Sequence, residues 1–503
     1  MSKFTQKENG GLYELTDAAR AELVDSTYYN EDLGPTSLAQ RTWTTYNIAS
    51  LWIGMAVCLP SYTLASGLMG AGLSLWQAVL NVALGNLLVL IPMQLNSHAG
   101  TKYGIPYPVF ARLAFGPKGA HLPAMARAFV AACWCGIQIY FGGGALHVII
   151  VQIIPAFGDV PGAQWITFGI FWAMNIYIGY AGDEAIKFME SWGAPILGVL
   201  CLALMAWATS MAAGVGATVG QLVSVPSQPE LLAKGGGFWA VFMVGLTGNI
   251  AFWATLALNI PDFSRYAKNQ RSQFRGQLYG LPTTMAAFAF VGAYVTSATS
   301  FIYNVPGGIF DPVAVIAKID SPVAAILGAI GIILATLTTN IAANIVAPAN
   351  GLTNLAPKKI TYKMGVIITG IFAVAIMPWK IMESGFNFFA FLGNYGIMLG
   401  PLAAIYIADY YIVKKRNIDV MALFQGSEGR YWYSNGVNYK ALITWVVACI
   451  LPFGGIFVPQ LLFFNQNGYL FSFAIAFVLY ILLMKNETTS FISDEQEEAM
   501  TER

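Results

Sequence analysis

Two threonines in an apolar stretch of this chain are spaced so that their hydroxyls could bind a small cation. Ala335, Thr338 and Thr339 stand at i, i+3 and i+4. In a helix this spacing places one carbonyl and two hydroxyls on the same face. Small hard cations prefer several oxygen ligands of this kind. Carbonyls of Gly54 and Val57, near a predicted break in an earlier helix, could complete the oxygen cage.

The same threonines have a second interpretation. Each hydroxyl could bond back to a carbonyl of the preceding turn, which is common in membrane helices. The spacing alone favours neither interpretation.

Four further residues suit a flat, polar heterocycle. Trp134 and Gln138 stand at i and i+4 and therefore share a helix face. An indole can stack on a ring while an amide offers a donor and an acceptor to its edge. Trp253 could form the opposite wall, and Asn344 offers a second amide. Each tryptophan taken alone is more often a packing residue or an interfacial anchor.

Charged side chains are missing from the middle of the predicted spans. Such a charge costs at least about 2.5–3.5 kcal/mol and persists mainly for function. A site without a charged anchor disfavours amino acids and other zwitterions. The absence of an intramembrane carboxylate also favours sodium over protons as the coupling ion. His147 is the one titratable group expected near mid-membrane, and packing is its more common role.

The composition requires a membrane around most of the protein. The chain has 503 residues, of which 57% are hydrophobic and 10% charged, with a mean hydropathy of +0.60. Soluble proteins carry about 25% charged residues. The net charge of +1 indicates no nucleic-acid partner. Neither HExxH nor GxSxG occurs, which argues against a membrane-embedded enzyme. A channel would be expected to line its path with recurring rings of polar or charged residues, and the sequence has no such pattern.

Long uncharged runs predict an all-α membrane protein with about twelve spans, since each span needs roughly 20 apolar residues. The predicted spans begin near Trp43, Leu75, Ala124, Gln164, Ser191, Phe238, Leu281, Pro322, Thr361, Gly385, Ala441 and Gly468.

Basic residues predict the orientation. They gather in the loops after the second, sixth, eighth and tenth spans, whereas the other loops carry only Lys234, Lys318 and Lys380. By the positive-inside rule, both termini and the even-numbered loops are expected in the cytoplasm. The protein is therefore expected in a plasma membrane, and for a bacterium in the inner membrane. The polar N-terminal tail is expected to be mobile.

Two spans are predicted to be interrupted. Gly54 and Pro60 would break the first span, and the pair Gly245 and Gly248 would break the sixth. Backbone released from helical bonds must line a cavity or pack inside the bundle. Broken helices at matching places in two halves indicate the binding site of a transporter. The alternative is that the glycines only let helices approach closely.

Three stretches resemble the nucleobase–cation symporter family 1, whose members carry hydantoins, allantoin, uracil, cytosine and related compounds. They are Asn96-Ser-His-Ala-Gly-Thr-Lys-Tyr-Gly-Ile-Pro-Tyr-Pro108, Trp253-Ala-Thr-Leu-Ala-Leu-Asn-Ile-Pro-Asp-Phe-Ser-Arg-Tyr266 and Gly400-Pro-Leu-Ala-Ala-Ile-Tyr-Ile-Ala-Asp-Tyr410. The resemblance runs from about Leu38 to the end of the last span.

The resemblance implies a core of two inverted five-helix repeats followed by two extra helices. The expected parts are an N-terminal tail (1–42), a first repeat (43–215), a second repeat (235–413), two further spans (440–486) and a C-terminal tail (487–503). It also implies that sodium binds at Gly54, Val57, Ala335, Thr338 and Thr339. The substrate-binding residues it implies are Trp134, Gln138, Trp253 and Asn344.

Two positions depart from the family's hydantoin carrier, which has a glutamine in place of Cys58 and a glycine in place of Phe252. The pattern therefore resembles the allantoin and uracil permeases more. The sequence predicts a cation-coupled importer of a nucleobase or related heterocycle, with no other cofactor. A proton-coupled cytosine, purine or hydantoin permease is the alternative. The oligomeric state stays open, and a monomer would suffice.

Overall fold

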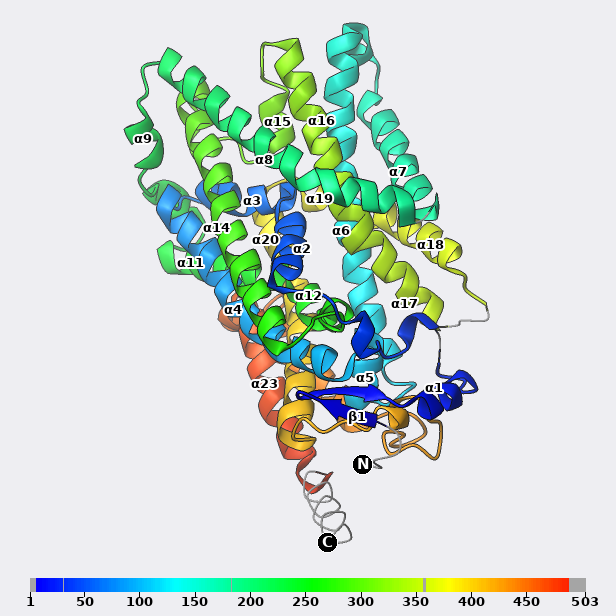
Figure 1. The fold of residues 1–503 in the computed structure, drawn as a ribbon. Coiled ribbons are helices and arrows are strands. Elements are labelled where there is room, and N and C mark those ends of the chain that lie inside the picture. Colours follow the sequence, from blue (N-terminus) through cyan, green and yellow to red (C-terminus); the bar gives the residue numbers. More distant parts are fainter. Residues whose placement is uncertain (1–5, 30, 182, 356–358, 488–503) are drawn as a thin grey trace.

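The computed structural model describes residues 6–29, 31–181, 183–355 and 359–487, and it is mainly helical (Figure 1). The helices that match the twelve predicted spans are α2 (Thr45–Ala56) with α3 (Leu59–Gly70), α4 (Leu75–Tyr103), α6 (His121–Ile153), α7 (Ala163–Ala181), α8 (Asp183–Gly214), α11 (Phe238–Phe252) with α12 (Ala254–Asn259), α14 (Gln270–Tyr303), α16 (Pro322–Thr339), α18 (Tyr362–Ala375), α20 (Gly385–Ile407), α21 (Tyr439–Gly454) and α23 (Gly468–Leu483). By length and composition, six helices of the described chain could cross a membrane, or up to eight if each bent pair is one span.

Most predicted starts agree with the structure to within two or three residues. The exceptions are α8 and α14, which begin at Asp183 and Gln270 rather than near Ser191 and Leu281. Their first turns carry charged residues such as Lys187 and Arg271. An apolar run cannot reveal such turns, because they extend a helix beyond the hydrocarbon.

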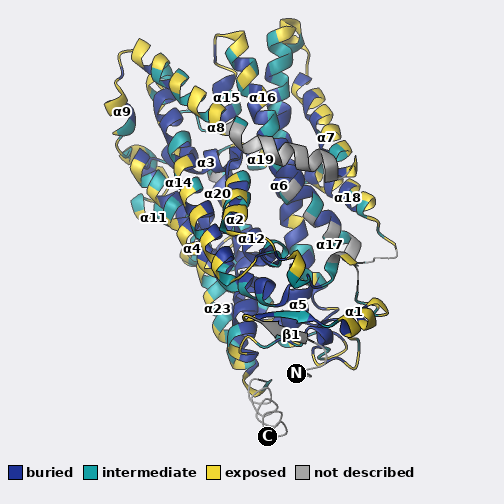
Figure 2. Ribbon diagram, viewed as in Figure 1, coloured by how far each residue is buried: buried dark blue, intermediate teal, exposed yellow. Residues whose placement is uncertain are grey.

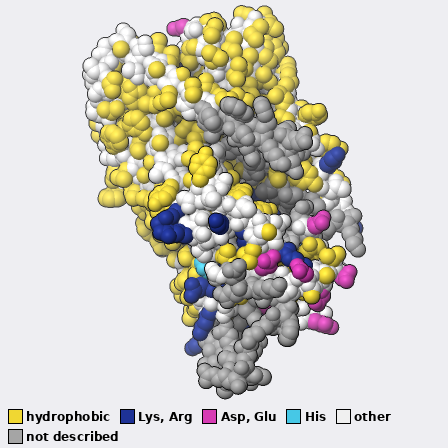
Figure 3. Space-filling model, viewed as in Figure 1, with side chains coloured by type: hydrophobic (Ala, Val, Ile, Leu, Met, Phe, Trp, Pro, Cys, Tyr) yellow, Lys and Arg dark blue, Asp and Glu magenta, His cyan; other side chains and the backbone are white. Residues whose placement is uncertain are grey.

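On the face drawn in Figure 3, apolar side chains cover much of the upper part, and most charged side chains lie in the lower part. Both described chain ends lie there (Figure 1). We call this end the basic face, after Lys102, Arg265 and Arg416. On α4, Trp76, Leu80 and Ile91 are 57%, 52% and 57% exposed, whereas buried residues line the interior of the bundle (Figure 2). This arrangement suits a protein surrounded by lipid.

The first span is broken between α2 and α3, which meet at 58°. The non-helical residues are Val57 and Cys58, whose ψ angles are 78° and 161°. Gly54 lies inside α2, and Pro60 lies in the first turn of α3, where a missing N–H costs little. The predicted break is therefore confirmed, but it falls between the two residues expected to cause it.

The sixth span is interrupted at Trp253, which separates α11 from α12. The prediction that Gly245 and Gly248 break it is wrong. A Cβ on Gly245 would lie 2.5 Å from Leu68, and one on Gly248 would lie 2.6 Å from Phe389. These glycines let α11 pack closely against α3 and α20.

The N-terminal segment folds against the basic face between residues 6 and 29. Strands β1 (Gln6–Asn9) and β2 (Leu12–Leu15) pair antiparallel and precede α1 (Asp17–Val24). Arg41 is buried and donates to the carbonyls of Tyr13 at 2.6 Å, Thr36 at 3.0 Å and Thr101 at 3.1 Å. Burial lowers the pKa of Arg41 to about 10, so the guanidinium stays charged at neutral pH. The tail is thereby tied to the end of α4.

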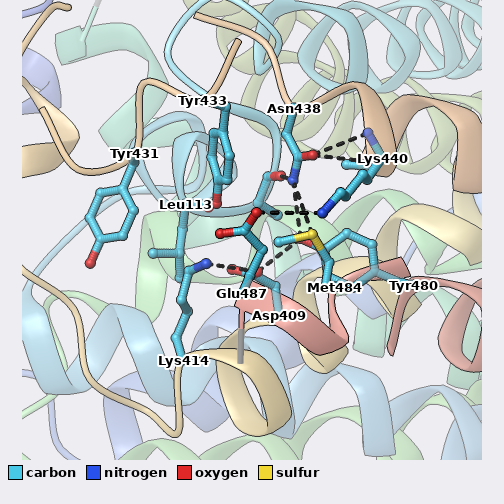
Figure 4. Close-up of polar contacts among 12 residues, drawn as sticks. Leu113, Asp409, Lys414, Tyr431, Tyr433, Asn438, Lys440, Tyr480, Met484 and Glu487 are labelled. Atoms are coloured by element: carbon cyan, nitrogen blue, oxygen red, sulfur yellow. Dashed lines mark hydrogen bonds and ion pairs between the residues drawn. The ribbon is translucent and has the colours of Figure 1, made fainter. Parts of the chain in front are cut away.

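A buried polar cluster fixes the last helix to the inner end of α20 (Figure 4). There α20 passes into a π-helical turn, η5 (Ala408–Val413). Asp409 lies 3.6 Å from the Lys414 ammonium and accepts a hydrogen bond from Tyr480 of α23 at 2.8 Å. Asn438 donates to the carbonyl of Ala114 at 2.7 Å. Helices α21 and α23 are therefore held to the rest of the helical bundle by buried polar contacts.

Candidate functional site

The break in the first span leaves two backbone carbonyls without partners. The Cys58 N–H donates to the carbonyl of Ala56 at 3.0 Å and so turns away from Gly54. The Ser61 N–H donates to the carbonyl of Cys58 at 3.1 Å and so turns away from Val57. Within the described chain, neither the Gly54 nor the Val57 carbonyl accepts a hydrogen bond. Val57 is buried and Gly54 is partly buried. Carbonyls that are shielded from water need a partner, and a cation can supply it.

The two threonines of α16 behave differently. The Thr338 hydroxyl donates to the carbonyls of Leu334 and Ala335, at 3.0 Å each. The Thr339 hydroxyl is buried and makes no hydrogen bond within the part of the chain that the structure describes. The Thr338 hydroxyl is therefore bonded back to its own helix, but the lone pairs of its oxygen remain available to a cation. Thr339 keeps its whole hydroxyl for another ligand.

The two tryptophans predicted to stack on the substrate meet through a third ring. Phe252 lies 5.0 Å from Trp134 and 5.0 Å from Trp253, edge-on to both. Trp134 also contacts Phe388 and Phe391 of α20, at 6.0 and 5.9 Å. The structure thus gathers an aromatic box from α6, α11 and α20.

Unpartnered polar atoms lie among the predicted binding residues. Gln138 is 1% exposed, and its Oε1 accepts no hydrogen bond from the described residues. Trp253 is 5% exposed, and its Nε1 finds no acceptor in the same part of the chain. Such atoms cost about 1–3 kcal/mol each when left unsatisfied. An acceptor and a donor are therefore available for a bound molecule.

A chain of buried amides orients Asn344. Its Nδ2 donates to Oδ1 of Asn340 at 3.1 Å, and Nδ2 of Asn340 donates to Oδ1 of Asn175 at 2.9 Å. Asn340 also donates to the carbonyl of Cys135, next to Trp134, at 3.3 Å. Because one N–H of the Asn344 amide is engaged by Asn340, the amide oxygen and the second N–H are left to read a substrate.

Asn340 and Asn175 were not predicted as part of the site. A signal for Asn340 was present, since it stands four residues before Asn344 in the same uncharged run. The sequence gives no comparable sign for Asn175 on α7. Asn340 and Asn344 both lie in a π-helical segment, η4 (Asn340–Val346), a feature frequent at functional sites.

His147 lies away from these residues. It stands six residues before the end of α6, and its ring lies 5.8 Å from Phe157 in the adjoining loop. The mid-membrane position of His147 stays a prediction, but its distance along α6 from Trp134 and Gln138 separates it from the candidate site.

Comparison with known proteins agrees with this architecture. Residues 35–476 match the family described as permeases for cytosine and purines, uracil, thiamine and allantoin. The allantoin permease of Bacillus subtilis is 39% identical over 91% of this chain and 93% of its own length. The purine–uracil permease of Arabidopsis thaliana is 38% identical over 92% of this chain and 78% of its own length.

Two solved structures of the transporter Mhp1 share the fold. The inward-facing form has a TM-score of 0.77 at 24% identity, covering 92% of this chain and 94% of that one. The closed form with bromovinylhydantoin bound is described as a nucleobase–cation-symport-1 family transporter. It has a TM-score of 0.72 at 25% identity, covering 92% and 97%. The predicted helical transporter fold is confirmed. By fold and by sequence, this chain is an integral membrane permease of the nucleobase–cation symport family 1.

Proposed function

We propose that this permease imports a small cyclic ureide or imide, of the size of uracil or of the allantoin ring, together with sodium. The carrying observation is two buried atoms without partners in the described chain: Nε1 of Trp253, whose ring contacts Phe252, and Oε1 of Gln138, one turn along α6 from Trp134. A ureide edge presents an N–H next to a C=O, and these groups complement that acceptor and that donor. The oxygen of Asn344 would accept a second N–H. The B. subtilis relative, named an allantoin permease, supports this choice of substrate class.

Sodium is proposed at the broken first span and α16. The oxygens offered there are neutral: the carbonyls of Gly54 and Val57, which accept no hydrogen bond in the described chain, the carbonyl of Ala335, and the hydroxyls of Thr338 and Thr339. Carbonyl and hydroxyl oxygens are the ligands that a hard monovalent cation prefers. Bound there, sodium would hold α2 and α3 against α16. A ligand shifts a conformational equilibrium only by its differential affinity, so coupling requires sodium and substrate to favour the same state.

The remaining predictions complete the proposal. The repeats are assigned to 43–215 and 235–413, and the basic face to the cytoplasm of a plasma membrane. Alternating access would expose the site between α6, α11 and α16 first to the outside and then to the basic face.

The test is uptake of radiolabelled uracil and allantoin by cells expressing this chain, with sodium present or replaced by choline. We expect saturable uptake of one compound that collapses in choline. Uptake indifferent to sodium but abolished by a protonophore would contradict the sodium site and favour the proton-coupled alternative. Transport of neither compound, with cytosine or a hydantoin accepted instead, would contradict the proposed substrate.

A further inference from the structure

A cavity of about 210 Å³ lies beside the proposed cation site, between α8 and α16. The outer half of the first span, α3, and the short helix α15 (Pro312–Ile316) close its other sides. Its walls include Cys58, Tyr62, Leu204, Trp207, Ile332 and Ala335. None of the lining residues is Asp, Glu, Lys or Arg, and the lining is mostly aliphatic and aromatic. The side-chain polar atoms on its walls belong to Tyr62, Trp207, Cys58 and Cys201.

The mouth of this cavity is on the perimeter of the bundle. Ala203 of α8 and Leu327 of α16 line the cavity and are also exposed, Leu327 to 53%. Their exposed neighbours Val199, Leu202 and Ile330 are apolar as well, at 67%, 68% and 41%. In a membrane-spanning protein, such a surface faces the hydrocarbon of the bilayer. The mouth is therefore open to lipid and not to water.

The volume and the lining determine what can fill the space. An apolar cavity of about 150 Å³ stays dry and takes up benzene, because water finds too few polar partners inside. This cavity is larger and also mostly apolar, with few polar side-chain atoms on its walls. The molecules at its mouth are hydrocarbon chains. We propose that an acyl chain of a membrane phospholipid enters between α8 and α16 and occupies this cavity.

The position gives the bound chain a structural role. Cys58 adjoins Val57, whose carbonyl is unpartnered, and Ala335 precedes Thr338 by one turn. An acyl chain packed against Cys58 and Ala335 would support α3 and α16 on the side that faces the cavity. This inference depends on the membrane location only and is independent of the substrate and of the coupling ion.

Trp207 on the cavity wall provides a direct readout. The full chain is reconstituted in vesicles of dioleoyl phosphatidylcholine or of its dibrominated counterpart, whose bromines quench tryptophans in contact with the acyl chains. The emission of Trp207 is obtained by subtracting the fluorescence of the Trp207→Phe variant from that of the parent protein. We expect the brominated lipid to remove at least half of that emission. Aqueous acrylamide should leave it nearly unchanged.

Filling the cavity distinguishes an inserted chain from lipid at the outer surface. Ala203→Phe places a ring in the mouth, while Leu202→Phe, on the neighbouring position outside the lining, is the matched control. Ala203→Phe should reduce the quenching of Trp207 at least two-fold, and Leu202→Phe should not change it. If Ala203→Phe does not fold, Ala324→Leu fills the same space from α16. Equal quenching in the filled and control variants would overturn the proposal, as would quenching by acrylamide in place of brominated lipid.

Discussion

The ring of Phe252 lies edge-on against Trp134, with their centroids 5.0 Å apart and an angle of 76° between the rings. The same ring lies 5.0 Å from Trp253 at 85°. Phe252 therefore stands between the two tryptophans proposed to enclose the substrate. A substrate that stacks on Trp134 must fit beside Phe252 or displace it.

This arrangement predicts that Phe252 limits the size of the substrate. Phe252→Ala should let the permease take up hydantoins with an aromatic substituent, at least ten-fold faster than the parent protein. Phe252→Leu, which keeps more of the volume, should have a smaller effect. The measurement is competition of benzylhydantoin and of uracil against the transported substrate. If benzylhydantoin competes with the transported substrate equally well in the parent protein and in both variants, another residue sets the size limit.

The indole nitrogen of Trp253 gives a second prediction. Trp253→Phe keeps a ring but removes the unpartnered N–H donor, which is worth about 1 kcal/mol, roughly five-fold in affinity. Trp134→Ala removes a stacking surface worth about 1–3 kcal/mol. We therefore expect KM to rise more for Trp134→Ala than for Trp253→Phe, with sodium half-saturation unchanged in both. An unaltered KM in Trp134→Ala would remove this residue from the site.

The two threonines of α16 should contribute unequally to sodium binding. The Thr338 hydroxyl is engaged with the carbonyls of its own helix, whereas the Thr339 hydroxyl is buried without a partner. Thr339→Ala should raise the sodium concentration for half-maximal uptake at least ten-fold, and Thr338→Ala should raise it less. Thr339→Ser restores the hydroxyl and should restore sodium affinity. Identical sodium dependence in Thr339→Ala and the parent protein would exclude Thr339 as a ligand.

Asn340 is predicted to act through Asn344. Asn340→Leu removes the acceptor that holds the Asn344 amide nitrogen, which is 3.1 Å away. The freed amide can then turn, so KM for the substrate should rise several-fold while the sodium half-saturation stays constant. Asn175→Leu, which loosens Asn340 without touching Asn344, should produce a weaker change of the same kind. A proportional loss of transport with KM unchanged would indicate a general folding defect instead.

The sequence predicted the helices well because a membrane span has a simple signature. Nearly all starts, such as Leu75 and Phe238, needed only an uncharged run and its polar boundary. The break at Trp253 could not be predicted this way, because no glycine or proline causes it. The amide chain through Asn175 joins residues 165 apart in the sequence, and only the packing of α7 against η4 brings them together. The polar composition of the N-terminal tail suggested mobility. The fold of this tail depends on hydrogen bonds from Arg41 to carbonyls distant in the sequence, and composition alone cannot show such contacts.

The buried pair Asp409 and Lys414 should stabilise the end of the bundle that holds α23. Both side chains are almost fully buried, at 0% and 1% exposed. Removing one partner of a buried ion pair typically costs about 3–5 kcal/mol, because the other charge loses its compensation. Asp409→Leu should therefore lower the thermal unfolding temperature of the purified protein strongly. Tyr480→Phe removes the hydrogen bond to Asp409 and the longer one, 3.4 Å, that Tyr480 accepts from Asn438. It should cost about 1.5–3 kcal/mol, mainly through the charged partner. The double variant Asp409→Leu, Lys414→Met removes both charges and should recover much of the loss. If the double variant is less stable than Asp409→Leu alone, Lys414 is stabilised by other groups, and the ion pair is not what holds α23 in place.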